Sequence, residues 1–148
     1  MKTAIVYYSK HHGNTKALLD AIAELGNVEL IDAIHPEKTD LTEYDRVGFA
    51  SGVYYSKYHK SVLAFAEQYL PSGMPVFFLH TAGDPRENQN AAIKAITDAK
   101  DCPALGTYSC KGFDTFGPFK LIGGLAKGHP DQKDVAGAVA FYESLANA

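Results

Sequence analysis

A strand-to-helix turn near the N-terminus has the residue composition of an anion-binding site. An apolar run at residues 3–8 precedes the turn and a helical pattern follows it. The turn consists of Ser9, Lys10, His11, His12, Gly13, Asn14 and Thr15. The first N–H groups of a helix have no intrahelical partner, and the helix dipole adds positive potential there. We therefore predict that a phosphate or similar anion binds here, although the same residues also suit an ordinary helix start.

Individual residues of the turn have distinct expected roles. Gly13 permits close backbone approach or a positive φ, and Asn14 or Thr15 is a candidate helix cap. The hydroxyls of Ser9 and Thr15 can donate to phosphate oxygens. The turn contains neither G-x-G-x-x-G nor G-K-[ST], which excludes a dinucleotide fingerprint and a nucleotide-hydrolysing P-loop.

Two later segments have the composition of a site for a flat ring. The first is the expected loop at residues 51–59, which begins Ser51, Gly52, Val53, Tyr54 and Tyr55. Its tyrosines can stack on a ring, or they can simply pack on neighbouring helices. The second segment is Thr81, Ala82, Gly83 and Asp84, followed by a proline. It predicts a tight turn with exposed backbone groups, which a plain surface loop would share.

Apolar runs and helical patterns alternate along the chain. Strands are expected at residues 3–8, 28–31, 46–51, 75–80 and 104–110, and helices at 15–25, 60–70, 88–99 and 134–145. This alternation predicts an α/β fold with a parallel sheet covered on both faces. Ligands bind outside the carboxyl ends of the strands in such sheets, so the three segments are expected to line one site. Residues 111–131 form a long loop whose Phe113, Phe116 and Phe119 make either a lid or a cover for one sheet edge.

Composition narrows the function classes. The 148 residues suit one domain, 1–148, and the formal net charge of −3 does not favour nucleic-acid binding. No apolar run approaches the roughly 18 residues of a membrane span. Cys102 and Cys110 are too few for a disulfide framework or a zinc site. We therefore expect a cytoplasmic protein without a metal site.

In this order, the three segments resemble the short-chain flavodoxin family over essentially all 148 residues. The resemblance implies a doubly wound sheet of five parallel strands, ordered 2-1-3-4-5, and non-covalent binding of flavin mononucleotide (FMN) for electron transfer. It places the phosphate at Ser9, His11, Gly13, Asn14 and Thr15. It places the isoalloxazine ring between Ser51–Tyr55 and Thr81–Asp84, with Tyr54 or Tyr55 stacking and Gly52 beside the reactive edge.

The chain departs from the family pattern in its charges. It is close to neutral, whereas soluble carriers of the family are usually strongly acidic, and Lys57, His59 and Lys60 lie near the expected flavin edge. Lys10, His11 and His12 replace small hydroxylated residues. Protonation of these histidines would attract phosphate, so FMN affinity is expected to weaken as the pH rises through about 6.5.

Three functions are consistent with these patterns. The first is an electron carrier that needs no catalytic side chain and exchanges electrons with redox proteins or small-molecule acceptors. The second is a small FMN-dependent NAD(P)H:quinone-type oxidoreductase, in which the basic residues attract the nucleotide. The third is a flavin-free binding module on the same fold. A receiver domain would need acidic residues after the first strand, and a tyrosine phosphatase would need a Cys and an Arg in the first turn, and the chain has neither.

Overall fold

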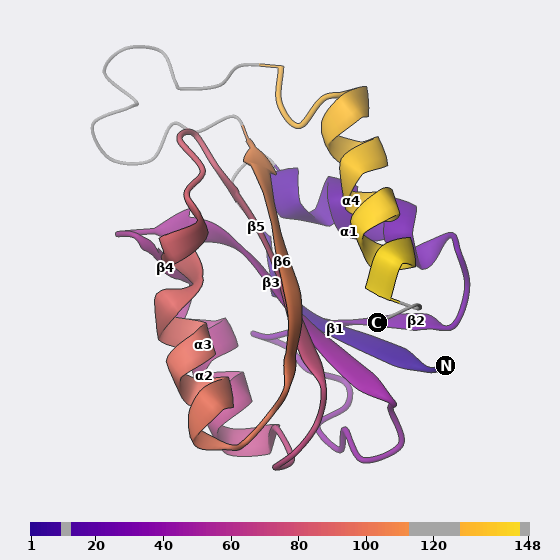
Figure 1. The fold of residues 1–148 in the computed structure, drawn as a ribbon, viewed down its shortest axis with the longest axis vertical. Coiled ribbons are helices and arrows are strands. Elements are labelled where there is room, and N and C mark those ends of the chain that lie inside the picture. Colours follow the sequence, from indigo (N-terminus) through magenta and orange to yellow (C-terminus); the bar gives the residue numbers. More distant parts are fainter. Residues whose placement is uncertain (10–12, 113–127, 146–148) are drawn as a thin grey trace.

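A parallel sheet with helices on both faces forms the body of the protein, in a computed structural model that describes residues 1–9, 13–112 and 128–145 (Figure 1). The sheet order is β2-β1-β3-β5-β6. Its strands are β1 (Thr3–Tyr8), β2 (Val28–Asp32), β3 (Arg46–Tyr54), β5 (Val76–Ala82) and β6 (Ala104–Lys111), and a short β4 (Lys57–Tyr58) pairs with β3. This order confirms the doubly wound topology that the sequence predicts.

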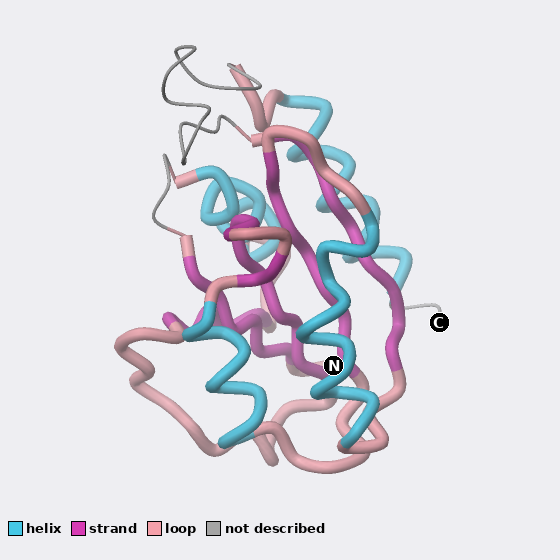
Figure 2. Tube along the Cα trace, turned by 90° about the vertical axis from the view of Figure 1, so that its left-hand side faces the viewer, coloured by secondary structure: helices cyan, strands magenta, loops and turns pink. Residues whose placement is uncertain are grey.

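Two helices cover each face of the sheet. The helices are α1 (Asn14–Ala23), α2 (Lys60–Tyr69), α3 (Ala91–Ala99) and α4 (Gln132–Leu145), and a 3₁₀ turn, η1 (Glu87–Asn90), precedes α3. Helices α1 and α4 lie on one face, and α2 and α3 lie on the other (Figures 1 and 2). No helix in the described part of the chain is long and apolar enough to cross a membrane.

A hydrophobic core lies on each face of the sheet, and successive residues of each central strand point alternately into one core and the other. This explains the nearly continuous apolar runs of the strands. On β1, Ile5 packs with α1 and α4, whereas Ala4 and Val6 pack with α2 and α3. The ring of the buried Phe77 lies over Gly48, and a Cβ at position 48 would be only 2.5 Å from it, so the packing favours glycine there. These two cores fix the sheet that positions the site.

The strand register places the expected site residues in two adjacent rows across the sheet. Tyr8 of β1 is the register partner of Ser51 in β3, and Gly52 is the partner of Thr81 in β5. All three strands run parallel, so their carboxyl ends lie at the same edge of the sheet. Residues 43 positions apart (Tyr8 and Ser51) and 29 positions apart (Gly52 and Thr81) in the sequence are therefore neighbours in space.

Two of the expected loops are partly strand. β3 continues to Tyr54 and turns back into β4, because Val53 and Tyr54 form antiparallel pairs with Tyr58 and Lys57. The two turn residues, Tyr55 and Ser56, have φ values of 51° and 65°, as a type I′ hairpin requires. The prediction of a loop at 51–59 is therefore wrong for residues 51–54 and 57–58, which are strand. The turn between them lacks the usual Asn-Gly signal of such a hairpin.

Other boundaries move by a few residues. β5 includes Thr81 and Ala82, which the sequence analysis assigns to a turn. α1 ends at Ala23 rather than at residue 25, and α4 begins at Gln132 rather than at 134. The proposed phenylalanine lid lies in residues 113–127, outside the described part of the chain.

Candidate functional site

The first turn of α1 has the backbone geometry of an anion site. Gly13 is the N-cap and has φ 65°, in the left-handed region that favours glycine. The first intrahelical bond runs from Ala17 N to the carbonyl of Gly13, so the preceding amides do not belong to the helical ladder. The prediction that Asn14 or Thr15 caps the helix is wrong, since both lie inside it. Lys10, His11 and His12 are outside the described residues.

Ser9 supports this turn from the other side. Its Oγ accepts a hydrogen bond of 2.9 Å from Lys16 N, the third residue of the helix. The interaction satisfies one otherwise unpaired N–H group of the first helical turn. The Ser9 hydroxyl keeps its own proton, which can be donated to a ligand oxygen.

A buried hydroxyl pair joins the first segment to the third. Thr15 Oγ1 lies 3.0 Å from Thr81 Oγ1, and both residues are almost fully buried. The two hydroxyls share one hydrogen bond, so one of their two protons remains available. Thr15 therefore connects α1 to β5, and whichever of the two hydroxyls accepts this bond keeps its own proton.

Three aromatic rings gather where β1, β3 and α2 meet. The rings of Tyr8 and His59 stack face to face, with centroids 3.6 Å apart and an interplanar angle of 6°. Tyr54 meets both at an edge, at 5.7 Å from Tyr8 and 5.2 Å from His59. All three side chains are partly buried. This aromatic cluster lies beside the anion site, because Tyr8 immediately precedes Ser9.

His59 is held as a neutral ring. Its Nδ1 accepts a hydrogen bond of 3.1 Å from Ser61 N and caps α2, which places the ring proton on Nε2. Burial lowers the pKa of His59, and the neighbouring charge of Lys60 lowers it further. From the sequence, His59 is expected only as a basic residue near the flavin edge, and its stacking on Tyr8 has no sequence signal.

Ser51 holds the start of the second segment in place. Its fully buried hydroxyl accepts a 2.9 Å bond from His59 N and donates a 2.5 Å bond to the carbonyl of Gly52. A Cβ at Gly52 would be in ordinary contact, 3.5 Å from the Tyr54 ring. The packing of the protein therefore does not require glycine at position 52, and close approach of a ligand remains a reason for it. Beyond it, Val53 and Tyr54 are partly buried, whereas Tyr55 is 85% exposed.

The third segment combines buried and exposed residues. Thr81 and Ala82 are buried at the end of β5, and Gly83 is buried after them. Asp84 is exposed and forms an ion pair of 3.0 Å with Arg86. The structure therefore brings Thr81 next to Thr15 in the first turn of α1, whereas the Asp84 carboxylate pairs with Arg86.

A buried polar chain that sequence reasoning missed connects the second and third segments. Tyr58 Oη lies 2.9 Å from His80 Nδ1, and His80 Nε2 lies 2.9 Å from the carbonyl of Arg86. The carbonyl only accepts, so Nε2 carries the proton and Nδ1 accepts from Tyr58. Burial lowers the pKa of His80 and raises the pKa of Tyr58. A tyrosine in the hairpin and a histidine within an apolar strand were the only sequence signals.

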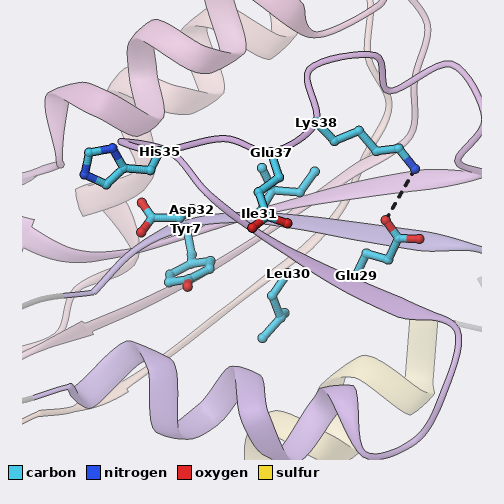
Figure 3. A pocket seen from close by; sticks show the side chains of 8 residues that line it. All are labelled: Tyr7, Glu29, Leu30, Ile31, Asp32, His35, Glu37 and Lys38. Atoms are coloured by element: carbon cyan, nitrogen blue, oxygen red, sulfur yellow. Dashed lines mark ion pairs between the residues drawn. The ribbon is translucent and has the colours of Figure 1, made fainter.

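A separate cavity of about 360 Å³ lies beside β2 (Figure 3). Three carboxylates line it, from Glu29, Asp32 and Glu37, and Lys38 Nζ lies 3.6 Å from Glu29. This excess of negative charge opposes binding of a phosphate. The cavity beside β2 is therefore a poorer candidate for a phosphate site than the first turn of α1.

Three possible metal ligands also gather at the start of α4. His129 Nδ1 lies 2.6 Å from Asp134 Oδ2, and Asp131 completes the group. Asp131 and Asp134 each accept a 2.9 Å bond from the backbone N–H of the other. These reciprocal bonds cap the helix, which accounts for both carboxylates.

The chain is similar to known proteins over most of its length. A family model described as a flavodoxin domain matches residues 5–109. An uncharacterised protein of Methanocaldococcus jannaschii is 36% identical over 98% of both chains.

Solved structures share the fold at low sequence identity. A flavodoxin from the domain Archaea has a TM-score of 0.63 and is 18% identical over 99% of both chains. The general stress protein 14 of Treponema denticola, solved in complex with FMN, has a TM-score of 0.65. It is 11% identical over 98% of this chain and 99% of its own.

Proposed function

Since the chain belongs to the flavodoxin domain family, we propose that it binds FMN non-covalently and transfers electrons. The observation that carries the proposal is the convergence of three segments at one sheet edge. The Thr15–Thr81 hydroxyl pair joins the first segment to the third, and the aromatic cluster of Tyr8, Tyr54 and His59 joins the first to the second. A charged group and a flat ring could therefore be bound side by side.

The residues at α1 fit a phosphate. Among the residues that the structure describes, none places a heavy atom within 4 Å of the position that a Cβ of Gly13 would take, so this part of the chain leaves the N-cap accessible. The first turn of the helix contains no acidic residue, and the helix dipole favours an anion. We assign the phosphate to the backbone around Gly13, Asn14 and Thr15, with Ser9 donating its hydroxyl proton. His11 remains a proposed contact from the family resemblance.

The second and third segments fit the isoalloxazine ring. Tyr54 presents a partly buried ring beside Gly52, and its neighbours Tyr8 and His59 are aromatic as well. Thr81 to Asp84 would face the other side, with backbone groups available to the ring's polar edge. Bound FMN supplies the redox chemistry, while the protein orients it and excludes water from it.

An FMN titration tests this proposal. Protein added to a fixed amount of FMN should quench the flavin fluorescence with a one-to-one end point. Stepwise anaerobic reduction of the complex should then proceed in two separate one-electron stages. A single two-electron stage would contradict the carrier function, and unquenched FMN would refute flavin binding and favour a flavin-free binding module.

One observation supports the oxidoreductase as a second candidate. Lys57 and Lys60 are exposed, and within the described residues neither forms an ion pair. Both therefore could attract an anionic nucleotide. Steady-state oxidation of NADPH or NADH with added quinones tests this function, and absence of turnover by the FMN-loaded protein would exclude it.

A further inference from the structure

We propose that the β3–β4 hairpin is a docking surface for a redox protein with an acidic face. The docking surface consists of Tyr55, Ser56, Lys57 and Lys60. The choice of an electron-transfer protein as the partner rests on the proposed FMN site, which this hairpin borders. The evidence for the surface itself comes from the shape, anchoring and charge of the hairpin.

The tip of the hairpin displays a large aromatic side chain. Tyr55 is 85% exposed, and Figure 1 shows the β3–β4 hairpin extending outward from the sheet. Both turn residues have positive φ values although neither is glycine. Such a conformation is unfavourable for residues with a Cβ and is typical of functional segments. Tyrosine is also enriched in protein interfaces.

The base of the hairpin is rigid. Tyr58 is 1% exposed and its hydroxyl bonds to the buried His80. On the adjacent residue, His59 N donates to the buried Ser51. The exposed tip therefore stands on a fixed support, which reduces the ordering cost of binding a partner.

The local charge is opposite to that of the whole chain. The formal net charge is −3, yet no acidic residue lies between Asp45 and Glu67. Lys57 and Lys60 are exposed within this stretch. The adjoining segment adds Glu87 in η1, while Asp84 is paired with Arg86. Within the described residues, the two lysines outnumber this one unpaired acid, so the surface is complementary to an acidic partner.

Tyr55 and the two lysines are close to the proposed FMN site, where electrons would be exchanged. Tyr54, a member of the aromatic cluster, is the residue next to Tyr55 and the pairing partner of Lys57. A protein that contacts the tip would therefore approach the proposed ring site. Charge complementarity would increase its rate of association and orient it there.

Binding of a two-iron ferredoxin of strongly negative net charge tests the proposal. Its Kd is measured by calorimetry at low and high salt, with the FMN-free and the FMN-loaded protein. A cytochrome c of strongly positive net charge serves as the opposite probe. We expect ferredoxin to bind the FMN-free protein as well, because the docking residues belong to the chain. Failure of FMN binding would therefore leave this test intact.

Charge-reversal variants give the decisive comparison. Lys57→Glu/Lys60→Glu should weaken ferredoxin binding about tenfold at low salt, and the difference should disappear near 1 M salt, where the Debye length is about 3 Å. Lys133→Glu on α4, a single reversal of an exposed charge on the opposite face of the sheet from α3, should have little effect. Tyr55→Asn, which tolerates the left-handed backbone, should weaken binding several-fold at every salt concentration.

Three results would overturn the proposal. The first is unchanged ferredoxin affinity in the double variant, and the second is an equal loss in Lys133→Glu. The third is tighter binding of cytochrome c than of ferredoxin by the unmodified protein. Circular dichroism of each variant confirms that the fold is retained, and the exposed positions make that outcome expected.

Discussion

Replacing Tyr58 with phenylalanine should measure how strongly the buried polar chain stabilises the fold. The change removes one hydroxyl and keeps the ring, which packs at an edge to His80. Tyr58 is 1% exposed and His80 is fully buried, so water cannot replace the lost donor at His80 Nδ1. Leaving such a buried acceptor unpaired costs about 1–3 kcal/mol. We expect a loss of about 2 kcal/mol, or about 4–8 °C in Tm.

Urea denaturation followed by circular dichroism provides the assay. Tyr69→Phe is the matched control, because within the described residues the Tyr69 hydroxyl makes no hydrogen bond while its ring packs on Phe65. A double-mutant cycle with His80→Leu should give a coupling energy of about 1–2 kcal/mol, since each single change leaves one partner unpaired. A loss in Tyr58→Phe no larger than that of Tyr69→Phe would refute the reasoning.

Three further predictions concern strain, pH and ligand binding. Ser56→Gly should stabilise the protein by about 0.5–1 kcal/mol in urea unfolding. A φ of 65° costs a residue with a Cβ about 1–2 kcal/mol, and the greater backbone entropy of glycine in the unfolded chain offsets part of the gain. An equal gain in Ser56→Ala would contradict the explanation. Burial lowers the pKa of His80 below its value of about 6.5 in the unfolded chain. The stability that the neutral His80 ring contributes is therefore fully present above about pH 6.5. It is lost as the pH falls, by at most about 1.4 kcal/mol per pH unit. His80→Leu should flatten the decline in unfolding free energy between pH 7 and 5, and an unchanged slope would count against this assignment. Thr15→Val removes the buried bond to Thr81 and should weaken FMN binding about tenfold in fluorescence titrations; unchanged affinity would exclude Thr15 from the site.

The fold was predictable because its signals are local and repeated. Each central strand is an apolar run with residues buried on both faces, and each helix has an apolar stripe. The residue patterns therefore predicted the alternation, and the family resemblance added the strand order. Boundaries were less predictable, since pairing between β3 and β4 extended a strand through residues that also suit a loop.

The site was predictable only as separate segments. Register places Tyr8, Ser51, Gly52 and Thr81 in neighbouring positions, which follows from three parallel strands. Side-chain contacts across the segments have no signal in sequence. Neither the face-to-face stacking of Tyr8 on His59 nor the bond between Tyr58 and His80 could be predicted, because each depends on the tertiary packing of two elements.

The absorption spectrum of the protein after mixing with FMN and gel filtration tests the central claim most directly. The claim is that the sheet edge at Gly13, Gly52 and Thr81 holds one FMN. We predict a yellow protein fraction that contains one flavin per chain. A colourless protein fraction, with all the flavin eluting later as free FMN, would contradict the account.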